Sequence, residues 1–321
     1  TAIVVCLALS TCVGPGGVTP GDAAQVLAAH LTGQESDNRL TDALVWALRV
    51  PRALLVALAG AALACAGAVT QGLFRNPMAE PGVLGVSTGA AVLAVAGMFL
   101  GLDTLGIWVT PLLAGLGAGF SLILLLTLVG PRRGIATLLL AGIALAAIGS
   151  ALTTLLLALA GARWDLGLKM IGWLMGSFEG RSWDHLYWGV GPILAGLGLA
   201  MWLHRDLDIL LLGDETARSL GVDMPAFRRR SVACIALLVG TTTAVAGVIG
   251  FVGLVVPHMI RIGIGPRHRR LLPASAAGGA LLVLLVDIVS RSSSEVVLPP
   301  GAITSLIGAP VFLWLLRRRQ L

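Results

Sequence analysis

Six long apolar runs recur along this chain, at 53–70, 83–101, 105–129, 135–161, 186–203 and 271–289. A helix of roughly 20 apolar residues crosses the hydrocarbon core of a bilayer, where only helices and closed barrels satisfy every backbone polar group. The composition agrees, because 57% of the 321 residues are hydrophobic and only 12% are charged. The sequence therefore predicts an all-α polytopic membrane protein in which residues 1–321 form a single transmembrane domain.

The apolar residues 1–14 begin with neither Met nor a basic leader. We interpret them as a first span whose start precedes this sequence, in preference to a signal peptide. The cysteines also fall in apolar runs and show no CxxC spacing, which favours small core residues over a disulfide framework or a zinc site. They are Cys6, Cys12, Cys65 and Cys234.

The basic residues predict the orientation. Fifteen of the 22 Lys and Arg residues lie in short segments that can share one side of the membrane, and such an excess marks the cytoplasmic side; the segments are Arg75, 130–134, 204–230, 261–270 and the C-terminal RRRQL. Both ends then lie inside and the number of spans is even. The segments 14–48 and 163–185 are external, and PGDAAQVLAAHLTG in the first predicts a surface helix capped by Asp22.

Only 30 residues separate Arg230 from Arg261, although the charge pattern places both on the same side. Two full spans would need about 40 residues, so this segment must fold back with short helices that turn near Gly247, Gly250 and Gly253. Irregular backbone at that depth is tolerated only inside the protein or beside a cavity. With a short last span at 302–316, the prediction is about ten transmembrane helices.

The sequence lacks the catalytic motifs that we sought. It contains no HExxH, no GxSxG and no acid pair within a span, and the only lysine, Lys169, is followed by Met170, so there is no P-loop. We therefore predict that the chain is not an enzyme and that any ATP hydrolysis belongs to another polypeptide. The net charge of +6 reflects loops beside spans rather than nucleic-acid binding.

One acid lies inside an apolar run. Asp287 precedes Arg291 by four residues, a spacing that puts both on one helix face. We favour a structural ion pair. An intramembrane acid is nevertheless a functional candidate, so a proton-coupled secondary transporter that uses Asp287 stays as the alternative function.

Four segments follow one another in a recognisable order: RVPRALLVALAGAALACAGAVTQGLFRNPMAEPGVLGVSTGAA (49–91), GDETARSLGV (213–222), GVIGFVGLVVPHMIR (247–261) and VVLPPGAITSLIGAPVFLWLLRRR (296–319). Together they resemble the ATP-binding-cassette importer permeases that take up ferric siderophores, haem and cobalamin, the FecCD-like transmembrane subunits. The resemblance covers nearly the whole chain. It does not distinguish among the three substrates.

The resemblance implies a homodimer around a central pathway in the cell inner membrane. It also implies two cytoplasmic ATP-binding subunits, which would hold ATP and Mg, and one periplasmic or lipid-anchored substrate-binding protein. No cofactor or metal is expected on this chain itself. Ten spans per subunit agree with the count above.

The resemblance assigns two surfaces. The segment that contacts the ATPase comprises Gly213, Asp214, Glu215, Thr216, Ala217, Arg218, Ser219, Leu220 and Gly221, with Asp214 as a helix cap; a solvated loop is the alternative. The residues that dock the binding protein would be Arg49, Arg52 and Arg291, although they could also extend to lipid headgroups. The chain reads VVLPPG where ELPxG is usual, with Glu295 shifted earlier, which weakens the match near Arg291.

By the same resemblance, the span at 135–161 and the last span line the pathway. The small and weakly polar residues of the former are Gly142, Gly149, Ser150, Thr153 and Thr154, which serve close helix packing equally well. Asn76 and Met78 are expected to form a cytoplasmic gate between two spans, with a plain turn as the alternative. Pro77 and Pro81 prevent those spans from fusing into one helix.

Overall fold

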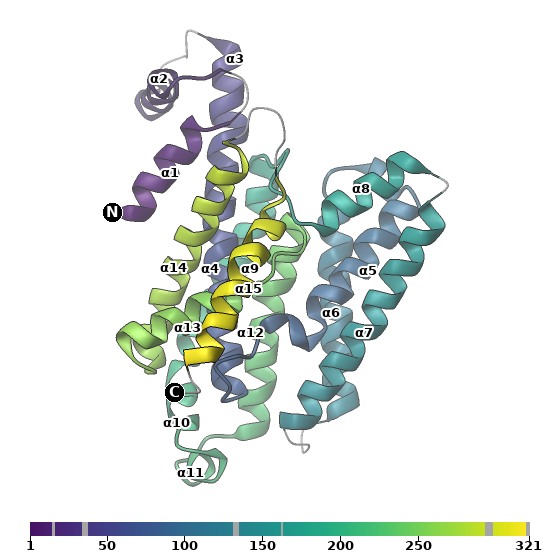
Figure 1. Ribbon diagram of the computed structural model, residues 1–321, viewed down its shortest axis with the longest axis vertical. Helices are drawn as coiled ribbons and strands as arrows, with labels where there is room; N and C mark the ends of the chain where they lie inside the picture. Colours follow the sequence, from purple (N-terminus) through teal and green to yellow (C-terminus); the bar gives the residue numbers. More distant parts are fainter. Residues whose placement is uncertain (15–16, 34–37, 131–134, 162, 293–297, 319–321) are drawn as a thin grey trace.

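The computed structural model describes residues 1–14, 17–33, 38–130, 135–161, 163–292 and 298–318, and within them the regular elements are helices (Figure 1). The apolar helices are α1 (Ala2–Cys12), α4 (Val50–Leu73), α5 (Val86–Phe99), α6 (Val109–Val129), α7 (Ile135–Ala160), α9 (Trp183–Trp202), α12 (Met224–Ala246), α13 (Val252–Ile264), α14 (His268–Ser290) and α15 (Pro300–Arg318). In Figure 1, α5, α6 and α7 form one group beside a larger group around α4.

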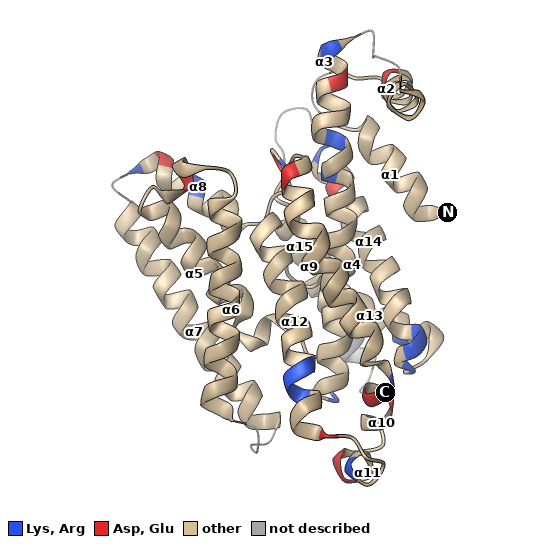
Figure 2. Ribbon diagram, turned by 180° about the vertical axis from the view of Figure 1, so that it is seen from behind, with Lys and Arg blue, Asp and Glu red and all other residues tan. Residues whose placement is uncertain are grey.

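Shorter elements lie at the two ends of this bundle. At one end are α2 (Pro20–Thr32), α3 (Arg39–Asp42), the π-helix η1 (Ala43–Arg49), the 3-10 turn η3 (Leu102–Leu105) and α8 (Trp164–Leu174). At the other end are α10 (His204–Leu210) and α11 (Asp214–Ser219), and the 3-10 turn η2 (Pro81–Leu84) precedes α5. Figure 2 shows the charged residues mostly near these two ends. We call the end with α2 and α8 the outer end, and the end with α11 the inner end.

Five helices among the described residues are long and apolar enough to cross a membrane: the continuous run Arg39–Leu73, α6, α7, α12 and α14. The pair α9 and α10, bent by 46°, makes a sixth candidate span. Shorter apolar helices are α1, α5, α13 and the Pro300–Leu313 part of α15. The all-α polytopic class is confirmed, and the total of ten crossings stays a prediction.

Helix α4 forms the centre of the larger group, where it packs against α14, α12, α9 and α13. The most apolar window of its helix is 78% buried, against 17% for α7. Glycines permit this closeness, because a Cβ atom on Gly60 would stand 2.2 Å from the carbonyl oxygen of Gly279 in α14. In lipid, burial of apolar side chains contributes little to the association of helices, so close backbone contacts of this kind hold helices together.

The segment 231–260 folds back as predicted, but only one of its helices is short. Helix α12 ends at Ala246, an extended stretch follows, and α13 begins at Val252. Gly247 lies at the turn with φ 72°, a backbone region that favours glycine. The prediction of two short helices is wrong because α12 begins inside the expected 204–230 loop, where Asp223 caps it by accepting a hydrogen bond from the N of Ala226 at 3.2 Å.

The external segment 14–48 contains the predicted surface helix, which is α2. Its N-cap is Thr19 rather than Asp22: Thr19 Oγ1 accepts from the N of Asp22 at 3.2 Å, and Asp22 Oδ2 accepts from the N of Thr19 at 2.9 Å. This reciprocal pair is a capping box. The pKa of Asp22 is lowered because its carboxylate accepts hydrogen bonds from the backbone N of Thr19 and from Thr19 Oγ1, the latter at 2.8 Å. No helix ends at residue 48, where the external segment was expected to end, because α3, η1 and α4 are continuous over Arg39–Leu73.

Candidate functional site

The turn between α4 and α5 lies at the inner end and holds the predicted gate residues. Asn76 Oδ1 accepts a hydrogen bond from the N of Met78 at 2.9 Å, which fixes the turn locally. Arg75, just before it, has a φ of 48°. Asn76 is exposed and Met78 is half-buried. The turn is thus ordered and polar, and its role as a gate stays a prediction.

Two side chains that were not assigned to the site from the sequence bind the region of α13: Glu80 of this turn and Gln71 at the end of α4. Glu80 Oε1 accepts a hydrogen bond from the N of Phe251 at 3.1 Å. Gln71 Nε2 donates to the carbonyl of Leu254 at 3.0 Å, and Gln71 Oε1 accepts from Arg261 Nη1 at 2.7 Å. A polar side chain in an apolar run needs such a partner, which is the sequence signal that could have found Gln71. Glu80 lies in the polar turn, where no such signal distinguishes it.

Helix α11 is the predicted ATPase-contacting segment, and the structure shows it as a six-residue helix at the inner end. Its N-cap is Gly213, so the expectation that Asp214 caps the helix is wrong. Asp214 is the first helical residue, and its carboxylate faces two arginines instead. Ala217 is buried, whereas Glu215, Thr216, Arg218, Ser219 and Leu220 are exposed. One side of α11 is therefore open to a partner.

The carboxylate of Asp214 bridges distant parts of the chain. Its Oδ1 lies 3.2 Å from Nη2 of Arg75, just before the turn between α4 and α5, and its Oδ2 lies 3.1 Å from Nη2 of Arg228 in α12. We call these three residues the inner cluster. It ties α11 directly to the turn between α4 and α5.

The predicted pathway residues on α7 divide into two sets. Gly142 and Gly149 are buried and pack closely: a Cβ on Gly142 would stand 2.4 Å from the carbonyl oxygen of Val83, and one on Gly149 would stand 2.9 Å from Cβ of Thr88. The structure thus shows these two glycines in the helix packing that the sequence analysis gave as the alternative.

Ser150, Thr153 and Thr154 instead line a cavity of about 310 Å³ together with Ser87 and Thr88. The hydroxyls of Thr88, Thr153 and Thr154 donate to carbonyls one turn earlier in the chain, at 2.9 Å each. No charged residue is among the described residues that line this cavity. Its wall is therefore weakly polar and holds no strong hydrogen-bond donor.

At the outer end, a buried carboxylate bridges two of the three predicted docking arginines. Arg52 Nη2 lies 2.7 Å from Asp287 Oδ1, and Arg291 Nη2 lies 2.7 Å from Asp287 Oδ2. The exposed fractions of these side chains are 0% for Asp287, 11% for Arg52 and 3% for Arg291. We call these three residues the outer cluster. Asp287 is thus a structural ion-pair partner, as expected, and nothing supports the alternative that it carries protons.

The remaining donors of this region hold segment 10–14, which comprises the end of α1 and the two residues after it. Arg49 donates to the carbonyls of Thr11, Cys12 and Gly14 at 3.0, 3.1 and 3.2 Å, and is 6% exposed. Arg291 donates to the carbonyls of Ser10 and Val13. Docking through the arginines stays a prediction, and Glu295, which the sequence analysis named beside them, lies outside the described residues.

The apolar helices define a polytopic helical membrane protein. Residues 2–318 match the model of the FecCD transport family, and the chain belongs to this family. The resemblance found in the sequence is therefore confirmed.

Known relatives are consistent with membership of this family. The chain is 39% identical over 320 residues to the vitamin B12 import system permease protein BtuC of Salmonella paratyphi A (strain ATCC 9150 / SARB42), and 40% identical over 318 residues to the protein of the same name from Shigella sonnei (strain Ss046). Each match covers 98% of this chain and 92% of the relative. These relatives are permease subunits, so the chain is of the transporter type rather than an enzyme.

Among solved structures, one described as an inward-facing conformation of a metal-chelate type ABC transporter superposes with a TM-score of 0.85 at 30% identity, covering 99% of this chain and 96% of that chain. The complex of PsaBC from Streptococcus pneumoniae with a Fab gives a TM-score of 0.55 at 17% identity, over 90% of this chain and 94% of that chain. The second likeness shows a shared fold alone.

Proposed function

We propose that this chain is the permease subunit of a binding-protein-dependent importer, and that it carries an iron chelate (ferric siderophore or haem) or cobalamin into the cell across the inner membrane. Two copies would enclose the pathway. Two cytoplasmic ATP-binding subunits would supply the energy, and one periplasmic or lipid-anchored protein would deliver the substrate. The observation that carries the proposal is the ion pair between Asp214 of α11 and Arg75 beside the turn between α4 and α5.

This link gives a physical route from ATP hydrolysis to the pathway. Closure of the ATPase subunits would move α11 as a rigid element. The inner cluster would pass that motion to Arg75 and the turn after it. Glu80 would then pass the motion on to Phe251, at the connection between α12 and α13. Alternating access follows if these contacts hold the turn in two positions.

Two features support a pathway between two copies. Helix α7 is poorly covered within one chain, since only 17% of its most apolar window is buried. The cavity that Ser150, Thr153 and Thr154 line beside this helix has a weakly polar wall, which suits a bulky chelate that must be released again. With the bent pair counted as one span, the six candidate spans and four shorter apolar helices are compatible with about ten crossings.

We also propose that the binding protein docks at the outer end through Arg49, Arg52 and Arg291. A guanidinium binds a carboxylate with two parallel hydrogen bonds, which suits an acidic partner. Because Arg49 and Arg291 hold segment 10–14, docking through them would require that segment to move. Arg52 is the most exposed side chain of the outer cluster.

Substitution of Arg52 tests this docking. We expect Arg52→Gln to weaken the affinity of the binding protein at least about tenfold, as for loss of a charge-assisted hydrogen bond. Biolayer interferometry with the permease in nanodiscs measures it. Arg39→Gln, at an exposed arginine of α3, is the control. Equal affinities of wild type and Arg52→Gln would refute the assignment.

The substrate is tested by uptake. Proteoliposomes that contain the permease, its ATPase and its binding protein should accumulate either radiolabelled cyanocobalamin or an iron-55 chelate when ATP is enclosed. The names of the relatives make cobalamin the first compound to test. Competition by unlabelled cobalamin, a ferric siderophore and haem then ranks the substrates, and failure of all three to enter or compete would refute the proposed substrate class.

A further inference from the structure

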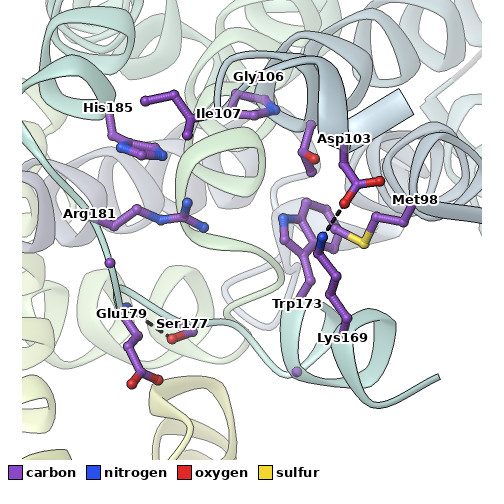
Figure 3. Close-up of a pocket in the computed structure, with 14 residues that line it drawn as sticks. Met98, Asp103, Gly106, Ile107, Lys169, Trp173, Ser177, Glu179, Arg181 and His185 are labelled. Carbon is purple, nitrogen blue, oxygen red and sulfur yellow. Dashed lines mark hydrogen bonds and ion pairs between the residues drawn. The ribbon is translucent and has the colours of Figure 1, made fainter. Parts of the chain in front are cut away.

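A second cavity, of about 530 Å³, lies at the outer end between α8 and the segment that leads into α9 (Figure 3). Its size is that of a small-molecule site. Met98, Ile107 and Trp173 give it apolar walls. None of its lining residues belongs to the inner cluster, the outer cluster or the cavity beside α7.

Most charged groups around this cavity are already engaged or directed away. Lys169 Nζ pairs with Asp103 Oδ2. The backbone N of Glu179 donates to Ser177 Oγ at 3.0 Å. Figure 3 shows the carboxylate of Glu179 pointing away from Arg181. In the part of the chain that the structure describes, no ion pair joins the Arg181 guanidinium to a carboxylate.

Two buried donors face this space without an acceptor. Arg181 Nε and Trp173 Nε1 have no hydrogen-bond partner among the described residues. Trp173 is only 8% exposed, so water cannot easily replace a partner. In Figure 3 the guanidinium of Arg181 and the indole nitrogen of Trp173 point toward one another across the cavity.

The charge of Arg181 persists at neutral pH. Burial, together with the like charge of Arg52, lowers the pKa of Arg181 to about 10, which still leaves the guanidinium protonated at pH 7. Arg181 is half-buried, and its buried Nε has no partner among the described residues. Together with the indole N–H of Trp173 it forms a set of donors that lacks an acceptor. Native proteins rarely leave such groups unsatisfied, and a ligand is one way to satisfy them.

We propose that this cavity binds a small organic anion through its carboxylate group, which accepts hydrogen bonds from Arg181 and from the indole N–H of Trp173. The apolar body of the ligand packs against Met98 and Ile107. Recognition combines one charge-assisted contact that fixes orientation with apolar contact that supplies affinity. The site is separate from the proposed transport pathway, and its existence does not depend on the identity of the imported chelate.

The test uses two probes of the same shape. The permease is assembled with its ATPase subunits in nanodiscs and titrated with 4-(trifluoromethyl)benzoate, followed by fluorine NMR. The neutral probe 4-(trifluoromethyl)benzyl alcohol measures partition into lipid and apolar contact alone. We expect saturable binding of the benzoate and at least about tenfold weaker binding of the alcohol.

Substitutions of Arg181 and Trp173 show which groups bind the benzoate. Arg181→Gln should weaken benzoate binding at least about tenfold, and Trp173→Phe, which keeps an aromatic ring and removes the N–H, about threefold. Arg163→Gln is the matched control, because Arg163 is an arginine at the same end that does not line the cavity. Should Arg181→Gln fail to assemble, Arg181→Lys replaces it and should weaken binding about threefold.

Three results would overturn the proposal. They are an absence of saturable benzoate binding, equal binding of the benzoate and the alcohol, and unchanged benzoate affinity in the assembled Arg181 variant. None of them bears on ATP-driven uptake, so they are distinguishable from a failure of the proposed permease function.

Discussion

Two aspartates at opposite ends of this bundle each bridge two arginines, but their surroundings differ. In the outer cluster the Asp287 side chain is 0% exposed and both ion pairs measure 2.7 Å. In the inner cluster the Asp214 side chain is 30% exposed and the ion pairs measure 3.2 and 3.1 Å. The same chemistry is therefore buried at one end and hydrated at the other.

This difference indicates different roles. A buried charge that loses its partner cannot recover its hydration, so breaking one pair of the outer cluster is strongly unfavourable. An exposed pair exchanges its partner for water at little cost, which permits repeated opening and closing. The outer cluster is thus suited to hold the outer ends of α4 and α14 together, and the inner cluster to transmit movement from α11.

Removal of the buried carboxylate should have the largest effect on stability. Asp287→Asn leaves Arg52 and Arg291 without their counter-ion, and we expect it to lower the free energy of unfolding by about 3–5 kcal/mol. Thermal unfolding in nanodiscs measures the loss as a lower midpoint. Asp214→Asn should cost less than about 1 kcal/mol in the same assay. Equal losses for the two variants would contradict the comparison.

Replacing one buried arginine should have the second largest effect. Arg291→Lys keeps the charge, but lysine cannot reproduce the fork that contacts Asp287, Ser10 and Val13. We expect a loss of about 1–3 kcal/mol. Arg228→Lys in the inner cluster is the matched substitution and should change stability by less than about 0.5 kcal/mol. The contrast fails if both lysine variants unfold at the same temperature.

Substitution in the inner cluster should affect the coupling of ATP hydrolysis to substrate uptake. Asp214→Asn should reduce ATP-driven uptake at least severalfold while the ATPase still binds, because α11 loses its ion pairs with Arg75 and Arg228. Uptake by proteoliposomes and ATPase co-purification measure the two quantities. Asp206→Asn on α10, an aspartate at the same end, is the control. Normal uptake by Asp214→Asn would show that the inner cluster does not transmit the motion.

The smallest expected difference between the two clusters is in how their coupling free energies respond to salt. Double-mutant cycles for Arg75 with Asp214, and for Arg52 with Asp287, give the coupling free energy of each pair. We expect the inner coupling to fall by a few tenths of a kcal/mol when salt rises from about 0.05 to 0.5 M, since exposed charges are screened over about 10 Å or less. The outer coupling should change less. A stronger salt response of the outer pair would contradict its burial.

Much of the fold could be predicted from the sequence. The runs at 53–70 and 135–161 correspond to α4 and α7, because about 20 apolar residues permit few structures other than a spanning helix. The start of α12 could not be predicted from charge alone. Arg228, Arg229 and Arg230 suggest a loop, yet Asp223 caps a helix that contains them.

The site was less predictable because its contacts join distant parts of the chain. The position of α11 followed from the family motif, whereas the partners of Asp214 lie in α12 and in the turn after α4. The burial of Arg49 depends on how segment 10–14 packs, which no local pattern reveals. Thr19 could have been recognised, since a Thr three residues before an Asp is typical of a capping box.

The source of energy for uptake tests the central claim most directly. Substrate uptake is measured in proteoliposomes that contain the permease, its ATPase and its binding protein, with either ATP enclosed or a pH gradient imposed across the membrane. We predict uptake with internal ATP and none with the pH gradient alone, since Asp287 is held between Arg52 and Arg291. Uptake driven by the pH gradient without ATP would contradict the account.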